Sequence, residues 1–445
     1  MANVIKLRKG LDITLAGKAA QEVKALGASK VYGLVPDAFY GVKPKVVVRE
    51  GDVVKAGDAL FVDKLHPEVN FVSPVSGKVS LVERGERRKV LSIQVEADSQ
   101  QQYKEFPKGM PADGQKVKEL LLESGMFAFM KQRPYAVTAN PDDAPKGIFV
   151  SAFNDMPLSQ DICFALKGQE ADFQTGVDAL TKIAKVFVGV KPGCALENTK
   201  NAEVTVFQGK CPAGNVGVQI NHTQPVNKGE VVWTIGAEEV VFIGRLINQG
   251  KVDLTRMVAV GGSEINNPSY VKALVGTPLA DILAGQVKTD KKVRLIQGSP
   301  LCGWQTSDKD FLGAHTTEIT TVAEGDEADE AFGWILPRFN QFSVSRTYCS
   351  WLFGKKKAYD FDTRIKGGHR HMIMSGEYDS VFPMDIFPEQ LVKAIITGDI
   401  DRMEALGIYE VAPEDFALCE FVDSSKLDVQ RIVREGLDML RKENA

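Results

Sequence analysis

The chain has 445 residues, enough for roughly three domains, and its 44% hydrophobic and 25% charged residues are typical of soluble globular proteins. This composition excludes a disordered, collagenous or low-complexity polymer. With 54 Lys+Arg against 58 Asp+Glu, the formal net charge of -4 argues against the broad basic surface that duplex nucleic acid requires, so we expect no nucleic-acid partner.

The N-terminal segment MANVIKLRKGLDITLAG has no uninterrupted apolar stretch of signal-peptide length, because Lys6, Arg8, Lys9 and Asp12 interrupt it. No other run approaches the ~18–20 apolar residues that cross a bilayer. We therefore expect no transmembrane segment and, at most, a peripheral membrane role.

Six cysteines are spread along the chain, and the closest two are Cys194 and Cys211. None forms the C-x-x-C pair typical of zinc sites, iron–sulfur clusters or redox dithiols. We interpret all six as cytosolic thiols that pack in the interior.

The first unit, residues 1–104, contains short β-branched runs over residues 42–95. Glycines at 51, 57, 77 and 85 punctuate these runs where tight turns need a positive φ. This pattern predicts an all-β unit built from hairpins.

The second unit, residues 105–254, begins with a polar linker followed by a helical pattern after residue 115. Strand-like segments GIFVSAFN, AKVFVGVKPG and EVTVFQGK then alternate with helical patterns. Strands and helices that alternate in this way predict an α/β layer with a largely parallel sheet.

Residues 255–335 predict an α+β unit of strand, Gly/Asn/Pro turn, strand and short helix, the helix capped at Thr277. Residues 336–445 become helical towards the end. We expect one helix to begin at Pro388 and end at Gly398, and a final amphipathic helix to follow.

Residues GDVVKAGDALFVDKL, followed by SPVSGKV, resemble the lipoyl/biotinyl-carrier barrel, and Asp63-Lys64 stands where that family has its modified lysine. The segment from Lys64 to Pro74 is slightly long for a turn that presents a lysine at its tip. We therefore interpret Lys64 as an unmodified, solvated residue, and a free-standing carrier enzyme as a minor alternative.

Nucleotide and metal motifs give little support for chemistry within this chain. Neither G-x-G-x-x-G nor G-x-x-x-x-G-K-[ST] is present, so we expect neither NADH nor FMN to bind this chain alone. His369 and His371 could ligate a metal with Glu377, but a polar loop is the favoured interpretation.

Two aromatic–basic clusters could bind a flat, apolar ligand that carries carbonyl groups. Rings offer stacking area, while a cation or hydroxyl can hydrogen-bond a carbonyl oxygen. The alternative is that these are core aromatics beside solvated cations. The candidate residues are Phe39, Tyr40 and Lys43 in the first cluster, and Phe129, Lys131, Arg133 and Tyr135 in the second.

An ordered series of segments covers nearly the whole chain: KLRKGLDITLAG, the barrel segments, CPAGNVGVQINHTQPV, RMVAVGGSEINNP, GWILPRFNQFSVSRTY, YDSVFPMDIFP and EDFALCEFV. Together they resemble the NqrA family, whose members are subunits of the Na+-translocating NADH:quinone reductases. The resemblance implies a peripheral subunit on the cytoplasmic face of the bacterial inner membrane. The implied complex is a six-subunit pump that passes electrons from NADH to ubiquinone or a related quinone and exports Na+.

The resemblance also implies a Rossmann-like α/β layer and a β-grasp-like SLBB insert at RMVAVGGSEINNPSYVKALVGTPLADIL. Related subunits of complex I and of the Rnf complex carry cluster cysteines or a flavin-binding glycine loop, whereas Cys419 stands alone here. The chain is thus expected to bind no cofactor and to have no catalytic residue of its own. Flavins and iron–sulfur centres would belong to partner subunits.

The resemblance links the two aromatic–basic clusters to binding of the quinone substrate and leaves a second role open. In the second role, the chain is a purely structural scaffold that holds the membrane-embedded partners together without touching substrate.

Overall fold

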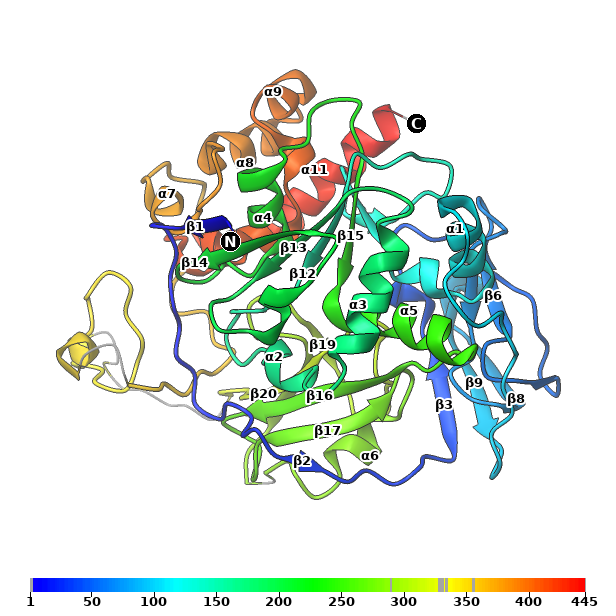
Figure 1. Cartoon of the computed structure of the whole chain (residues 1–445). Helices are drawn as coiled ribbons and strands as arrows, with labels where there is room; N and C mark the ends of the chain where they lie inside the picture. The colour runs from blue at the N-terminus through cyan, green and yellow to red at the C-terminus, as the bar shows by residue number, and fades with distance from the viewer. Residues whose placement is uncertain (1–2, 289, 327–331, 333–334, 354–356, 445) are drawn as a thin grey trace.

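The computed structural model describes residues 3–288, 290–326, 332, 335–353 and 357–444. Four β-sheets organise these residues, and the helices of the C-terminal region cover one end of the molecule (Figure 1). The predicted order of a β unit, an α/β unit, an α+β unit and a helical end is confirmed at this coarse level.

The β unit consists of a four-stranded and a three-stranded sheet made of hairpins, as the glycine-punctuated runs predict. Gly77 has a φ of 157°, and a Cβ there would meet the carbonyl oxygen of Glu96 on the neighbouring strand. The strands are β3 (Val31–Leu34), β9 (Val90–Ala97), β8 (Gly77–Arg84) and β5 (Val53–Val54) in the first sheet, and β4 (Pro44–Val46), β6 (Ala59–Asp63) and β7 (Asn70–Val72) in the second.

The α/β unit is a seven-stranded sheet in the order β1-β14-β13-β12-β15-β10-β11, parallel from β1 to β15 and antiparallel at β10 and β11. Its strands are β1 (Asn3–Lys6), β14 (Glu203–Gln208), β13 (Val186–Val190), β12 (Ile148–Ser151), β15 (Val232–Gly236), β10 (Lys131–Arg133) and β11 (Val137–Thr138). The helices are α1 (Gly114–Glu123), α2 (Ile162–Ala165), α3 (Glu170–Leu180), α4 (Val216–Thr223) and α5 (Ala237–Gln249). The three parallel strands predicted from the sequence are confirmed.

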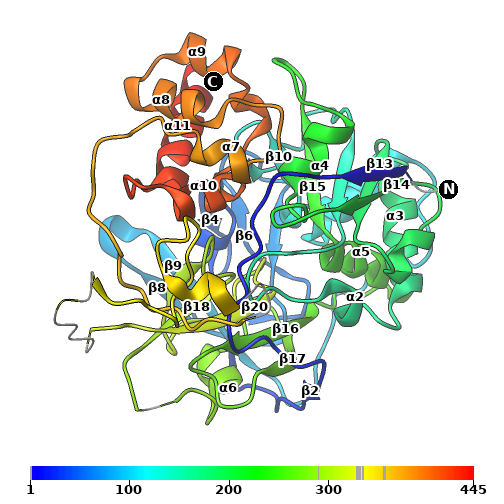
Figure 2. The ribbon, with the colours of Figure 1, turned by 90° about the vertical axis from the view of Figure 1, so that its left-hand side faces the viewer.

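Helices α3 and α5 pack tightly against each other beside this sheet (Figure 1). The close approach depends on glycines, because a Cβ at Gly176 would meet the carbonyl oxygen of Val240 and one at Gly244 that of Asp172. Helix α4 contacts β12 and lies towards the C-terminal helices (Figure 2).

The α+β unit is a six-stranded sheet in the order β19-β18-β20-β16-β17-β2. Its elements are β19 (Trp304–Thr306), β18 (Val293–Gln297), β20 (Glu318–Ala323), β16 (Thr255–Gly262), β17 (Ser269–Leu274), β2 (Val23–Lys24) and helix α6 (Leu279–Leu283). The predicted Thr277 cap is wrong: Pro278 is the N-cap, and the Thr277 hydroxyl instead donates to the carbonyl of Leu274 at 2.7 Å.

The first residues of the chain tie separate sheets together. Strand β1 extends the seven-stranded sheet beside β14, and β2 extends the six-stranded sheet beside β17. Both pairings are parallel. Because β1 and β2 belong to different sheets, the N-terminal segment contacts two units before it enters the β unit.

The C-terminal region is a group of helices around an apolar core that it shares with Ile13 and Leu15 of the N-terminal segment and Val218 of α4. Its helices are α7 (Glu377–Val381), α8 (Pro388–Thr397), α9 (Ile400–Ala405), α10 (Ala417–Val422) and α11 (Val429–Glu443). The predicted start at Pro388 and stop at Gly398, which has a φ of 69°, are confirmed. The predicted apolar stripe of α11 is confirmed as well, with Val433, Leu437 and Leu440 fully buried.

Two cysteines are joined, which corrects the prediction of six thiols. Cys163 and Cys194 form a disulfide with their Cα atoms 5.7 Å apart. They follow β12 and β13, neighbouring parallel strands whose carboxyl ends lie at the same edge of the sheet. Four cysteines are free, of which Cys211 and Cys419 are buried as expected and Cys302 is exposed.

In the part of the chain that the structure describes, no helix has both the length and the apolar character needed to cross a membrane.

We expect Leu437→Ala to lower the free energy of unfolding by about 2–5 kcal/mol, because the substitution leaves a cavity at a fully buried position of α11. Chemical unfolding followed by circular dichroism measures the change. Met439→Ala is the matched control on the same helix, since the Met439 side chain is 39% exposed. An equal loss in both variants would contradict the packing role of Leu437.

Candidate functional site

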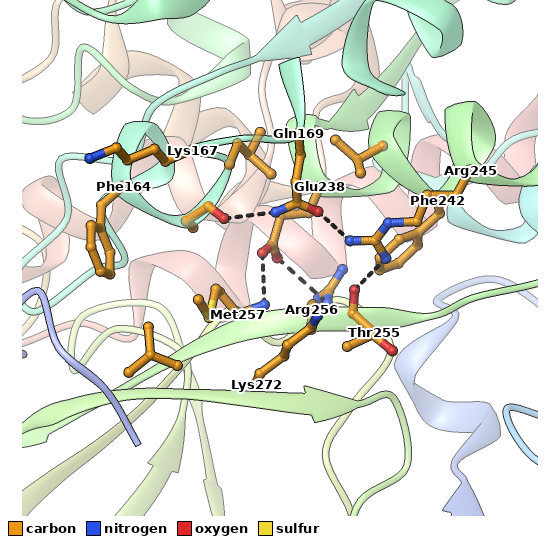
Figure 3. Close-up of a pocket in the computed structure, with 14 residues that line it drawn as sticks. Phe164, Lys167, Gln169, Glu238, Phe242, Arg245, Thr255, Arg256, Met257 and Lys272 are labelled. Carbon is orange, nitrogen blue, oxygen red and sulfur yellow. Dashed lines mark hydrogen bonds and ion pairs between the residues drawn. The ribbon is translucent and has the colours of Figure 1, made fainter. Parts of the chain in front are cut away.

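The strand order of the seven-stranded sheet reverses at a switch point, β12, since β13 and β14 lie on one side of β12 and β15 lies on the other. In open α/β sheets, ligands bind in the crevice outside the carboxyl ends of strands at such a point. Gln160 lies on the connection that leaves β12, and Glu238 and Glu239 lie in the first turn of α5, directly after β15. Strand β16 of the next sheet runs past these residues (Figure 3).

A buried guanidinium connects the two sheets at this point. Arg256, on β16, donates from Nη1 to the carbonyl of Thr316 at 3.0 Å and from Nη2 to Oε1 of Glu239. Its Nε lies 3.6 Å from Oε2 of Glu238. Oε1 of Glu238 accepts from Nε2 of Gln160 and from the backbone N–H of Met257, each at 3.2 Å. The network therefore holds α5 and the connection after β12 against β16.

The charges of this network do not balance if every group is ionised. Glu238, Glu239 and Glu318 are all nearly fully buried, and Arg256 is the cation that acts on them. Burial raises the pKa of Glu238 to about 7, because desolvation and the neighbouring Glu239 outweigh the attraction of Arg256. Burial also raises the pKa of Glu318. The site thus favours a proton on Glu238 below about pH 7.

Beside the network lies a cavity of about 340 Å³. Its walls include the rings of Phe164 and Phe242 and the cationic side chains of Lys167, Arg245 and Lys272 (Figure 3). Glu238 also lines the cavity, and its buried Oε2 has no hydrogen-bond partner among the described residues.

Arg245 is held in a fixed position on one wall of the cavity. Its Nη1 donates to the carbonyl of Thr255 at 2.7 Å, and its Nη2 donates to Oε1 of Gln169. Arg245 and Arg256 both lie over the ring of Phe242, at 5.7 and 5.3 Å from its centroid. The cavity therefore combines an aromatic wall, fixed donors and a carboxyl group that can carry a proton, a combination suited to a small ring with carbonyl groups.

The structure brings the two predicted aromatic–basic clusters together through their phenylalanines. Phe39 and Phe129 are buried, their ring centroids are 6.1 Å apart, and the ring of His315 lies within 5.7 Å of both. Phe129 also contacts Phe242 of the cavity wall at 5.7 Å. These two candidates thus lie behind the cavity wall.

Tyr40 and Lys43 lie away from the cavity. The Tyr40 hydroxyl donates to Oδ2 of Asp438 at 2.7 Å, and Arg434 lies 4.4 Å from the centre of its ring, so Tyr40 contacts α11. The Lys43 side chain is exposed, and its backbone N–H donates to Oδ1 of Asp63 at 3.2 Å.

The polar members of the second cluster also face other partners. Lys131 is exposed, whereas Arg133 is buried and donates to Oε1 of Glu414 at 3.0 Å. The Tyr135 hydroxyl accepts from Nδ2 of Asn444 at 3.3 Å. Arg133 and Tyr135 therefore connect β10 and the residues after it to the C-terminal region.

Other candidates from the sequence lie in exposed segments. Lys64 is exposed on the turn between β6 and β7. His369 and His371 lie in an exposed loop, as favoured, where Nδ1 of His369 is 2.9 Å from the carbonyl of Lys426. With Glu377 they form no metal-ligating group among the described residues.

Glu238, Phe242 and Arg256 were not predicted from the sequence as site residues. The one available signal was the pair Glu238-Glu239 before the apolar run VVFIG. This signal is weak, because acidic residues in the first turn of a helix ordinarily interact with the helix dipole at the surface. Only the approach of β16 makes both glutamates buried.

Substitution Glu238→Gln should make stability less sensitive to pH. A folded-state pKa of about 7, above the ordinary 4.5, means that the folded chain holds this proton more tightly than the unfolded chain. Wild-type stability should therefore fall by up to about 3 kcal/mol, relative to the variant, as pH rises from about 4.5 to 7. Chemical unfolding at a series of pH values measures this difference.

The matched control is Glu119→Gln on the exposed face of α1, which should follow the wild type at every pH. A constant difference between Glu238→Gln and wild type across the range would show that folding does not raise the pKa of the Glu238 carboxyl.

Comparisons with known proteins cover almost the whole chain. Family models described as "NqrA N-terminal barrel-sandwich hybrid domain", "NqrA second alpha/beta domain" and "NQRA C-terminal domain", an SLBB model, match residues 5–98, 112–252 and 257–308. A solved NAD+-reducing [NiFe]-hydrogenase aligns over 47% of both chains with a TM-score of 0.34 and 10% identity, a likeness too remote to assign a fold.

The curated relatives align from end to end. The NqrA subunits of the Na(+)-translocating NADH-quinone reductases of Neisseria meningitidis serogroup B and Yersinia pestis bv. Antiqua are each 35% identical over 99% of this chain and 100% of their own. The corresponding subunit from Haemophilus influenzae is 34% identical with the same coverage. The chain belongs to the NqrA family of Na(+)-translocating NADH-quinone reductase subunits.

Proposed function

We propose that this chain contributes to quinone binding and to assembly of a Na+-translocating NADH:quinone reductase, as a peripheral subunit on the cytoplasmic face of the bacterial inner membrane. The observation that carries the proposal is the 35% identity to NqrA subunits of such reductases over the full length of both chains. Electrons then reach the quinone from flavins and iron–sulfur centres in the partner subunits, several of them membrane-embedded, and this chain holds no such cofactor.

The cavity at the switch point is the place that best suits the quinone ring. A quinone presents two apolar faces, which Phe164 and Phe242 can contact, and carbonyl oxygens, which need donors. Lys167 and Lys272 lie at its exposed rim and can approach a carbonyl oxygen. A protonated Glu238 adds a neutral donor, and a carboxyl group with a pKa near 7 is suited to proton transfer.

The seven residues predicted from the sequence do not line this cavity. Phe129 supports Phe242 from behind, and Phe39 supports Phe129. Tyr40, Arg133 and Tyr135 bond the C-terminal region, which favours a part in assembly or stability. As direct quinone ligands, the seven residues stay a prediction.

In the assembled reductase, we expect Lys167→Gln together with Lys272→Gln to raise the KM for quinone about five- to thirtyfold, because the rim loses two donors worth about 0.5–1 kcal/mol each. Recovery of the complex should not change. The matched control is Lys185→Gln, an exposed lysine that lies 4.8 Å from the Phe187 ring on β13. Quinone-dependent NADH oxidation measures the KM.

The same assay on Tyr40→Phe separates the predicted cluster from the cavity. The substitution removes only the hydroxyl that bonds Asp438. A raised KM in Tyr40→Phe with an unchanged lysine double variant would favour the sequence-derived cluster. Loss of assembly in the lysine variant, with quinone kinetics intact in the complex that forms, would favour the purely structural scaffold.

The isolated chain should contain no stoichiometric flavin or iron. The sequence has no glycine loop for a flavin phosphate, and two of its six cysteines are used in a disulfide. Acid release followed by flavin fluorescence and iron analysis of the purified chain measures this. A yellow or brown preparation with one cofactor per chain would contradict the assignment of all redox groups to partners.

A further inference from the structure

Three metal-ligating side chains converge where the β unit meets the α/β unit, remote in sequence from the residues of the switch point. His66 and Glu68 lie on the turn between β6 and β7, and Asp142 lies on the loop after β11. One ligand atom from each residue lies within 4.8 Å of the other two.

Each of the two segments is held by its own hydrogen bonds. In the turn, Oδ1 of Asp63 accepts from the backbone N–H of Leu65 at 3.1 Å, and the N–H of Val69 donates to the carbonyl of His66 at 3.0 Å. In the loop, Oδ1 of Asn140 accepts from the N–H of Asp142 at 3.0 Å. These bonds therefore set the shape of each segment without help from the His66, Glu68 and Asp142 side chains.

The ligand atoms lie at ion-pair distances that are longer than hydrogen bonds. Nδ1 of His66 lies 3.5 Å from Oδ2 of Asp142 and 3.8 Å from Oε1 of Glu68. No hydrogen bond joins the three side chains in the described structure, whereas charge-assisted bonds measure about 2.7–2.9 Å and the Lys89–Asp37 pair measures 2.6 Å.

These separations match the edge of a metal coordination shell. Ligands about 2.1 Å from a tetrahedral ion lie about 3.4 Å from one another. Two carboxylates that face each other also repel unless a cation lies between them. The observed gap has the size and the charge that a small divalent ion requires.

We propose that His66, Glu68 and Asp142 bind one divalent transition-metal ion of the Zn2+ class, with water as the remaining ligand. An imidazole nitrogen beside two carboxylate oxygens favours Zn2+ over Mg2+ or Ca2+, which prefer oxygen ligands alone. The side chains are 27%, 45% and 78% exposed, respectively, so the ion can enter from solvent. Bound there, it connects the β6–β7 turn to the loop after β11.

Titration of the chelator-treated full chain with ZnCl2, by calorimetry and thermal unfolding, tests the proposal. We expect one ion per chain and a higher Tm with Zn2+. His66→Ala and Asp142→Asn should each weaken the Kd at least about tenfold. Tm values without metal show whether the variants fold. The matched control is His369→Ala, which removes an exposed loop histidine elsewhere and should keep full binding.

Three results would overturn the proposal: no saturable Zn2+ binding by the wild-type chain, equal affinity in wild type and His66→Ala, or loss of binding in His369→Ala alone. Equal affinity for MgCl2 would overturn the transition-metal assignment, since it would indicate a site made by the carboxylates only. None of these results depends on quinone or on the partner subunits, so the test is independent of the proposed function.

Discussion

Arg256 joins the seven-stranded sheet to the six-stranded sheet at the place where the two meet. Its guanidinium bonds Glu239 of α5 and the carbonyl of Thr316 just before β20. A buried cation without partners costs several kcal/mol, so these acidic residues must face it. The same requirement leaves more buried carboxylates than the one cation can balance, and the pKa values of Glu238 and Glu318 are raised. The cavity and its proton-carrying wall therefore follow from the way the two sheets are joined.

Local signals in the sequence determined much of the fold. The hairpins of residues 42–95, the strands of the α/β unit and the helix from Pro388 to Thr397 were predicted because turn glycines, buried β-branched runs and proline act within a few residues. The disulfide, the pairing of β1 with β14 and that of β2 with β17 were not predicted. They join segments far apart in sequence, and no local pattern encodes such contacts.

In the candidate site, too, local patterns could be predicted from the sequence and contacts between distant residues could not. Aromatic residues beside cations suggested a ligand, and the structure does bring Phe39 and Phe129 together. The cations and hydroxyls beside them have other partners: Tyr40 bonds Asp438, 398 residues away, and Arg133 bonds Glu414, 281 residues away. Asp438 lies on the helix predicted as amphipathic, and Glu414 lies on the short 3-10 helix Pro413–Phe416. The sequence could therefore identify the side chains but not their partners.

The two roles proposed for the family, substrate contact and scaffold, are linked in this chain by packing. One continuous apolar core includes Phe61 of the β unit, Phe39, Phe129 and Phe242. Interiors are close-packed, so a ligand that displaces Phe242 must also displace Phe129, and Phe129 lies against Phe39. A ligand that moves Phe242 would thus also disturb the contact between the β unit and the α/β unit. Under the proposed function, variants behind the cavity wall should change both quinone affinity and assembly, whereas variants at its exposed rim should separate the two.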